Sequence, residues 1–289
     1  MIKSAWRLVM YTYSPLRYPG GKTQLSKFVK AILEENNLLG GTYVEPYAGG
    51  AGIAMYLLTN GYVANVFIND IDYSVYAFWN SVVNHAEELC KLILDTPVNL
   101  DTWKVQKEIY NNPQNHSVLE VGFATFFLNR TNRSGILKGG IIGGNDQKGK
   151  YKIECRYNKE GLIERIDKIV RFADRIQVSN MDAVDFLRTN ENRFNQKTLV
   201  YLDPPYYEKG QQLYINYYTH DDHVRLMEYI RNEAQINWII TYDNNENISK
   251  IYTGFNMLYI PIRYSAAKKR EGSELLFYSE NLIIPKFVY

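Results

Sequence analysis

The sequence predicts an α/β protein: an open sheet with helices on both faces, interrupted by an inserted, mainly helical module. Short apolar runs alternate with helix-length stretches along most of the chain, and several of the apolar runs end on an acidic residue. Strands separated by helices of about 10–15 residues are typical of such sheets. The alternation stops between residues 86 and 160, a gap far longer than an ordinary connection, which predicts the insertion.

The elements before the interruption can be assigned in order. TYVEPY (42–47) and YVANVFIND (62–70) are predicted strands because they are short apolar runs bounded by turn residues. GIAMYLLTNG (52–61) is a predicted helix that Gly61 ends, and SVYAFWNSVVNH (74–85) has helical periodicity.

Residues 86–128 are expected to be helical with a break near Asn111–Pro113, and residues 129–160 to be a Gly-rich, basic and irregular connection. The alternation then resumes. The predicted helices are 162–175, 182–189, 221–234 and 245–253, and the predicted strands are 176–180, 198–203, 237–242 and two final strands.

The composition is that of an ordinary soluble protein, with 289 residues of which 46% are hydrophobic and 22% charged. No apolar run reaches the roughly 18 residues that cross a bilayer. The N-terminus lacks an apolar segment followed by a small-residue cleavage site. Cys90 and Cys155 lie far apart and suggest neither a disulfide framework nor a zinc site. We therefore expect a cytoplasmic protein with no membrane partner and no metal.

The charge is unevenly distributed. The net charge is +2, but residues 129–171 hold eleven Lys or Arg against five Asp or Glu, a balance of +6 that leaves −4 for the rest. A basic segment on a mildly acidic body is typical of a polyanion site. Lysines scattered on a solvated loop would give the same balance.

Four acidic residues lie at or just past the carboxyl ends of predicted strands: Glu45, Asp70, Asp182 and Asp203. Open α/β sheets bind ligands at this edge, so we expect a site there.

The segment EPYAGGAG (45–52) combines a strand end, a Gly-rich turn and a helix start. Its glycines would let the backbone approach a ligand, or would serve only a tight turn. It is neither the G-x-G-x-x-G fingerprint nor a phosphate-binding loop, and an acidic residue before the glycines would repel a pyrophosphate. Asp70 follows about 20 residues later, where a carboxylate commonly holds a ribose. A ligand with a positive charge and a ribose is favoured.

The most specific motif is DPPY (203–206), which ends the predicted strand LVYL. Its two prolines hold the turn rigid and fix the Pro204 carbonyl beside the Asp203 carboxylate. Two such acceptors suit an exocyclic amino group, and Tyr206 offers a flat face for a planar base. RYPGGK (17–22) is a second Gly pair before a predicted helix, and taken alone it indicates only a loop.

In combination these motifs resemble those of the Dam-like (D12 class) DNA adenine N6-methyltransferases. RYPGGK is similar to the family's N-terminal cofactor motif, EPYAGGAG to its E-P-F-x-G-x-G turn, and DPPY to its catalytic signature. FFLNRTNRSGI (126–136) is similar to the L-N-R-x-x-x-N-G segment that opens the recognition module. RYSAAKKREGSELLFY (263–278) is similar to a C-terminal R-x-S…R…ELL-x-Y stretch. The resemblance covers about residues 15–280 in the family's alpha motif order.

The resemblance implies a Rossmann-like, S-adenosylmethionine-dependent methyltransferase sheet with a helical target-recognition insertion. The catalytic domain would comprise residues 12–85 and 161–289, and the insertion residues 86–160. It implies an enzyme that moves the methyl group of S-adenosylmethionine to N6 of a flipped adenine at specific sites in double-stranded DNA. A cognate restriction endonuclease would be a partner in a restriction–modification system.

Residue roles follow from the same resemblance. Asp70 would take the ribose hydroxyls, Glu45 would lie near the methionine end of the cofactor, and Asp182 near its adenine. The implied catalytic residues are Asp203, Pro204, Pro205 and Tyr206. The implied cofactor-binding residues are Tyr18, Gly20, Gly21, Lys22, Glu45, Pro46, Gly49, Asp70, Asp182 and Asp203.

The basic segment would contact DNA phosphates and pair arginines with guanine. The expected DNA-binding residues are Arg130, Asn132, Arg133, Ser134, Lys138, Arg156, Lys268, Lys269 and Arg270. The sequence departs from the Dam group at Tyr18, where that group often has Trp, and at Arg133-Ser134, where it has the DNA-contacting pair Tyr-Asn. Because of the second departure, GATC is not carried over as the target.

Three alternatives stay open from the residues. One is a methyltransferase of the same fold that acts on cytosine N4, an RNA base or a protein glutamine; such enzymes more often have Ser or Asn in place of Asp203. Another is an inactive DNA-binding homologue, against which the intact Lys22, Asp70, Asp203 and Tyr206 argue. A dehydrogenase is the third, and the missing dinucleotide fingerprint disfavours it.

Overall fold

The computed structural model describes residues 13–17, 22–208, 218–264 and 270–286. In these residues seven strands form one sheet in the order β3-β2-β1-β4-β5-β7-β6. The predicted α/β class is confirmed, and every predicted strand is present close to its predicted bounds. The strands are β1 (Thr42–Glu45), β2 (Asn65–Asn69), β3 (Ile176–Ser179), β4 (Thr198–Leu202), β5 (Asn237–Asp243), β6 (Asn256–Tyr264) and β7 (Arg270–Tyr278).

The order of the strands indicates the edge of the sheet at which a ligand would bind. Strands β1 to β5 run parallel, and β7 inserts antiparallel between β5 and β6. β1 pairs with β2 on one side and with β4 on the other, so the winding of the chain reverses between β1 and β4. Ligands bind at the carboxyl ends of the strands at such a reversal. Glu45 ends β1 and Asp203 directly follows β4, so both acidic residues lie at this point.

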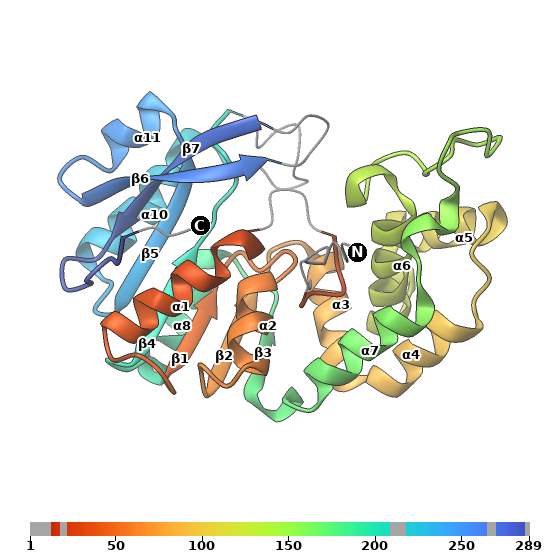
Figure 1. Ribbon diagram of the computed structural model, residues 1–289, viewed down its shortest axis with the longest axis horizontal. Coiled ribbons are helices and arrows are strands. Elements are labelled where there is room, and N and C mark those ends of the chain that lie inside the picture. Colours follow the sequence, from red (N-terminus) through yellow and green to blue (C-terminus); the bar gives the residue numbers. More distant parts are fainter. Residues whose placement is uncertain (1–12, 18–21, 209–217, 265–269, 287–289) are drawn as a thin grey trace, which may run out of the picture.

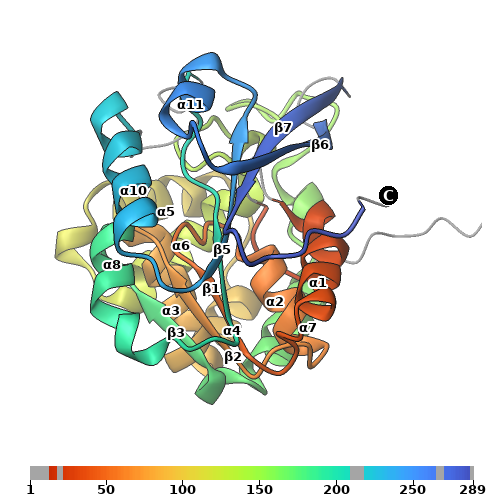
Figure 2. The ribbon, with the colours of Figure 1, turned by 90° about the vertical axis from the view of Figure 1, so that its left-hand side faces the viewer.

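Helices cover both faces of the sheet. Figure 2 shows α8 and α10 on one side of it and α1 and α2 on the other. The helices in the described residues are α1 (Ser26–Glu35), α2 (Gly52–Thr59), α3 (Tyr73–Asn84), α4 (Ala86–Asp95), α5 (Leu100–Asn111), α6 (Val118–Thr131), α7 (Lys159–Val170), α8 (Ala183–Asn190), α10 (His220–Asn232) and α11 (Glu246–Ile251).

The core has two main parts because strand side chains alternate between the faces. Tyr43, Leu199 and Ile239 belong to the cluster that packs on α1 and α2, whereas their neighbours Val44 and Val200 belong to the cluster that packs on α8 and α10. Both faces of the central strands are therefore buried. This explains why the strands read as continuous apolar runs in the sequence.

The interruption folds as helices α4 to α6, which lie beside the sheet next to α3 and α7 (Figure 1). The break expected near Asn111–Pro113 is present, because α5 ends at Asn111, but a second break that was not predicted lies at Thr96, after α4. Pro97 follows, and a residue before proline disfavours helical geometry. α6 continues to Thr131, past the predicted end, and all its residues from Val121 are buried. The division at 86–160 stays a prediction, because α7 packs on both α4 and α3.

Candidate active site

Asp203 is held in place at the end of β4. Its Oδ1 atom lies 2.6 Å from the Lys22 Nζ and accepts a hydrogen bond from the Thr241 hydroxyl at 3.0 Å. Thr241 belongs to β5, and its Oγ1 lies 2.9 Å from the Tyr201 hydroxyl oxygen. Asp203 therefore has a fixed orientation, and its side chain keeps 21% of its surface exposed.

Lys22 supplies a buried positive charge to this group. Its side chain is 4% exposed and also lies 3.5 Å from the Glu274 carboxylate. Burial by itself would lower the pKa of Lys22, but Asp203 and Glu274 raise that pKa well above its ordinary value. Lys22 is thus a cation held between two carboxylates.

Tyr206, which was expected to offer a flat face to a base, is held by contacts within the protein. Its ring is only 6% exposed, its hydroxyl donates to Glu274 Oε1 at 2.6 Å, and the Lys22 ammonium lies 5.1 Å from the ring centre. In this conformation the ring is not open to a stacking base. In the same tetrapeptide Pro204 is buried and Pro205 is half-buried.

The turn after β1 adopts a left-handed geometry, with φ of 45° at Gly49 and 44° at Ala51. The Trp79 indole donates to the Gly49 carbonyl at 2.9 Å. A Cβ at Gly52 would lie 2.3 Å from the Thr23 hydroxyl oxygen, so this glycine allows the segment after Lys22 to pack on the turn. The segment that begins at Lys22 and the Gly-rich turn are therefore neighbours in space.

Glu45 lies beneath this turn. It is 5% exposed, and its Oε1 accepts a hydrogen bond from the Ala54 backbone N–H at 3.1 Å. Burial raises its pKa to about 8, and the nearby charge of Asp203 adds to the shift. A cationic ligand would stabilise the ionised form of Glu45 and so offset the free-energy cost of burying its charge.

Asp70 ties the turn to the end of β2. One carboxylate oxygen accepts from the Gly49 backbone N–H and the other from that of Asp72, both at 2.9 Å. Burial raises the pKa of Asp70 to about 7, and the charge of Asp72 contributes. Ile71, which follows, is 47% exposed and presents an apolar surface beside the carboxylate.

Asn69 joins three strand ends, and sequence reasoning missed it. Its amide donates to the Pro46 and Met181 carbonyls at 3.0 and 2.9 Å and accepts from the Met181 backbone N–H. The available signal was a polar residue at the end of an apolar strand. A buried amide there must find partners, and it finds them on the two neighbouring connections.

The Asp182 carboxylate binds groups within the protein. Its carboxylate caps α8 by accepting from the backbone N–H groups of Val184 and Asp185, and it lies 3.2 Å from Arg225. Its predicted place near an adenine ring stays a prediction.

Asn129 and Arg130, near the end of α6, bind the backbone of residues 15 and 17. Asn129 accepts from the Arg17 backbone N–H at 2.7 Å and donates to its carbonyl at 3.0 Å, while the Arg130 guanidinium donates to the Pro15 carbonyl. A Cβ at Gly135 would lie 2.2 Å from the Arg17 carbonyl oxygen, so only glycine fits there. These contacts place residues 15–17 against the end of α6.

Two of the residues that were expected to contact DNA are buried. Arg130 is 6% exposed, and burial lowers its pKa to about 9. Asn132 is fully buried; it accepts from the Trp103 indole and donates to the carbonyls of Ile136 and Leu137. Both side chains bind the protein itself.

The other expected DNA-binding residues divide into two groups. Arg133, Ser134, Lys138 and Arg156 are exposed. Lys268 and Lys269 lie outside the described residues, and Arg270 begins β7 without a described side chain. The expected cofactor-binding residues Tyr18, Gly20 and Gly21 also lie outside the described residues.

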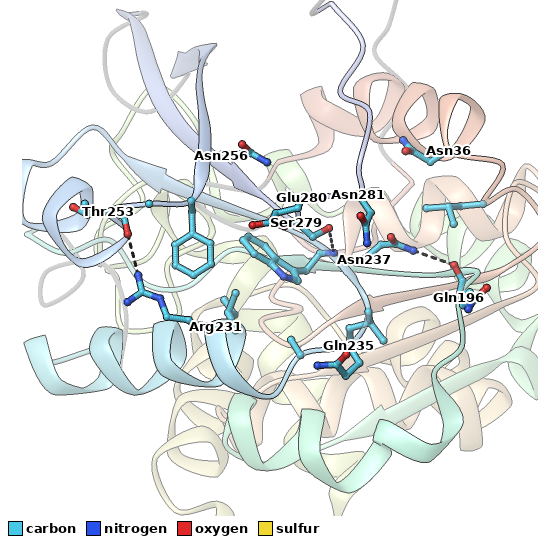
Figure 3. Close-up of a pocket in the computed structure, with 17 residues that line it drawn as sticks. Asn36, Gln196, Arg231, Gln235, Asn237, Thr253, Asn256, Ser279, Glu280 and Asn281 are labelled. Atoms are coloured by element: carbon cyan, nitrogen blue, oxygen red, sulfur yellow. Dashed lines mark hydrogen bonds between the residues drawn. The ribbon is translucent and has the colours of Figure 1, made fainter.

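A second polar region lies at the opposite edge of the sheet. This groove of about 830 Å³ is formed around the start of β5 and the residues after β7, and Figure 3 shows its many amide side chains. The Asn237 amide donates to the Gln196 carbonyl at 3.0 Å, and Arg231 donates to the Thr253 carbonyl at 2.9 Å. It contains none of the predicted site residues.

Within the residues that the structure describes, no group of three or more His, Cys, Asp or Glu side chains is arranged to hold a metal ion. In that same part of the chain, none of the helices has the length and apolar character needed to span a membrane.

Comparison with known proteins identifies the family. A family model described as D12 class N6 adenine-specific DNA methyltransferase matches residues 18–265. The chain is also 24% identical over 265 residues to the Type II methyltransferase M.MjaIII of Methanocaldococcus jannaschii, with 84% of this chain and 88% of that protein covered. The family match spans most of the chain and confirms the resemblance of the motifs. This chain belongs to the D12 class of N6 adenine-specific DNA methyltransferases.

Proposed function

We propose that this adenine-specific DNA methyltransferase uses S-adenosylmethionine as its methyl donor and Asp203 as the group that positions the target amine. The observation that carries the proposal is the fixing of Asp203 at the end of β4 through one carboxylate oxygen, by Lys22 and Thr241. The family establishes the reaction; the donor and the role of each residue are our inference.

The residues around the β1 turn fit this donor. Glu45 and Asp70 are carboxylates whose pKa values burial raises to about 8 and about 7, so a ligand with positive charge would stabilise their ionised forms. S-adenosylmethionine carries an ammonium and a sulfonium. Asp70 would accept from the ribose hydroxyls, and exposed Ile71 would contact an apolar ring. When bound, the donor would supply an electrophilic methyl group.

Asp203 would orient the nucleophile. In the described residues both side-chain hydrogen bonds to Asp203 reach Oδ1, which leaves Oδ2 as an acceptor for one amino proton. The Pro204 carbonyl would accept the other. Together they would draw the N6 lone pair out of conjugation with the ring and aim it at the methyl group. Positioning and electrostatics supply most of the catalysis in such a site, and no strong base is needed.

The target adenine must leave the duplex, because N6 is out of reach of this site within stacked DNA. We assign the DNA-facing surface to exposed Arg133, Lys138 and Arg156 and to the basic segment around them. The insertion 86–160 would be the target-recognition module.

A cognate restriction endonuclease is the further partner that we propose. The relative M.MjaIII is named a Type II methyltransferase, and DNA methyltransferases of this kind act beside an endonuclease that reads the same site. We place the reaction in the cytoplasm, where the DNA and the donor are found.

The test is expression in cells that lack adenine methylation, followed by sequencing that detects N6-methyladenine. We expect one methylated motif for the wild-type protein and none for Asp203→Ala. Methylation that persists in Asp203→Ala would overturn the role of Asp203. Methyl groups found only on cytosine would overturn the assignment of the acceptor.

A further inference from the structure

Glu274 is a buried carboxylate that the proposed mechanism does not use. It lies on β7, opposite Asp243 of β5 and Ile260 of β6, and its side chain is fully buried. β7 pairs with β5, and β5 pairs with β4, the strand that leads into Asp203. A carboxylate is expensive to bury unless it is paired, so its partners indicate its function.

Two of those partners, Lys22 and Tyr206, lie beside Asp203. Glu274 Oε1 accepts the Tyr206 hydroxyl proton at 2.6 Å, and Oε2 lies 3.5 Å from the Lys22 Nζ. Lys22 in turn donates to the Tyr206 hydroxyl oxygen at 3.3 Å. The three side chains form a closed triangle, and each of them comes from a different part of the chain.

The triangle fixes the position of Lys22 relative to Asp203. Two carboxylates surround one ammonium, and each holds the ammonium by charge. Without Glu274 the ammonium would lose one of the two carboxylates that surround it. Without its hydrogen bond to Glu274, the buried Tyr206 side chain would lose one of the contacts that hold it.

We propose that Glu274 is a positioning residue for methyl transfer, which holds Lys22 and Tyr206 in place beside Asp203 without touching the substrate. This inference rests on the proposed function of Asp203. It adds an anion on the C-terminal hairpin to the machinery of the site.

The first test is Glu274→Gln, which keeps the size of the side chain and a hydrogen-bond acceptor for Tyr206 but removes the charge. Single-turnover methylation of DNA that carries the mapped motif should slow by about 100-fold, as displaced catalytic groups do. In this proposal Glu274 touches neither ligand, so the affinities for S-adenosylmethionine and DNA should change much less than the rate.

The pH profile provides a second measurement. The titratable groups facing Lys22 are Asp203, Glu274, Tyr201 and Tyr206. Glu274→Gln removes one of the two carboxylates that hold the proton on Lys22, so the alkaline limb of the rate should move to lower pH. A purely structural role for Glu274 would leave this limb in place.

Phe277→Leu is the matched control. Phe277 lies on the same strand, is buried, and stacks on Tyr252 at 4.8 Å, away from Asp203. It should lower the melting temperature and leave the methylation rate and its pH profile unchanged. If Glu274→Gln does not fold, Glu274→Asp serves instead, because it keeps the charge and withdraws the carboxylate from Tyr206. That variant should fold and slow transfer at least tenfold, and a wild-type rate would overturn the proposal.

The outcomes separate the two proposals. Wild-type methylation that Asp203→Ala abolishes, with a wild-type rate in the Glu274 variant, would overturn the role of Glu274 and leave the proposed function intact. A wild-type protein that binds DNA but methylates no adenine would overturn both. Slow transfer with an unchanged control supports the role of Glu274.

Discussion

The two edges of the sheet are both polar, but they differ in how their polar groups are held. At the carboxyl edge, Lys22, Asp203 and Glu274 are charged groups largely removed from water and paired with one another. At the opposite edge, the groove of Figure 3 contains mainly amides, and Asn237 binds nearby backbone carbonyls. Buried charges with perturbed pKa values are costly and are typical of catalytic sites. The comparison teaches that size and polarity do not distinguish the two edges, whereas buried charge does, and we place the proposed chemistry at the edge with the buried charge.

The largest effect should come from removing the cation of the carboxyl edge. Lys22→Met would remove the ammonium that lies between Asp203 and the buried Glu274 carboxylate, and breaking a buried ion pair by removing one partner typically costs about 3–5 kcal/mol. We expect methylation to fall at least ~100-fold and the melting temperature to drop. A methylation assay and a thermal unfolding scan would measure both. Near-normal activity in this variant would contradict the conclusion that buried charge distinguishes the proposed catalytic edge from the opposite edge.

A substitution at Asp70 should have a smaller effect. It should weaken the binding of S-adenosylmethionine and change how that binding depends on pH. Asp70 and Glu45 ionise near pH 7 and 8 in the free protein, and a cationic donor binds their ionised forms better. Affinity for S-adenosylmethionine should therefore rise from pH 6 to pH 8, with protons released on binding. Asp70→Asn should weaken binding about tenfold and flatten the rise near pH 7. Calorimetry in buffers of different ionisation enthalpy would measure the released protons.

Asp70 and Glu45 also make the stability of the free protein depend on pH. Their folded-state pKa values lie above the ordinary values of 3.8 and 4.5, so between about pH 4 and pH 8 the folded chain binds more protons than the unfolded chain. Their contribution to stability is complete below pH 4 and is lost as the pH rises through 7 and 8. A donor-dependent melting temperature that increases most above pH 7 would agree with the proposed binding site.

The smallest effect is expected in the opposite groove. Asn237→Ala removes hydrogen bonds to the carbonyls of Gln196 and Thr198, which should cost about 1 kcal/mol of stability. The methylation rate and the affinity for the donor should stay at the wild-type values. A large loss of activity in a variant that is still folded would show that the groove takes part in function.

The sequence by itself determined the class of fold and predicted the edge of the sheet at which we place the chemistry. Apolar runs and helical periodicity are local signals, and they placed the strands within a few residues. Because parallel strands present their carboxyl ends together, Glu45, Asp70 and Asp203 could be assigned to one edge before any packing was known. The motifs also indicated the family, which the comparisons confirmed.

Only the tertiary structure decided which side chains meet. Lys22 reaches Asp203 across 181 positions of sequence, and Glu274 reaches Tyr206 across 68. Packing also turned Arg130 and Asn132 inward, although their charge and motif indicated a surface facing DNA. The physical reason is that a local pattern records which residues form a strand, helix or turn. The partner of a buried polar group depends instead on which distant element packs against it, and on the cost of leaving that group unpaired.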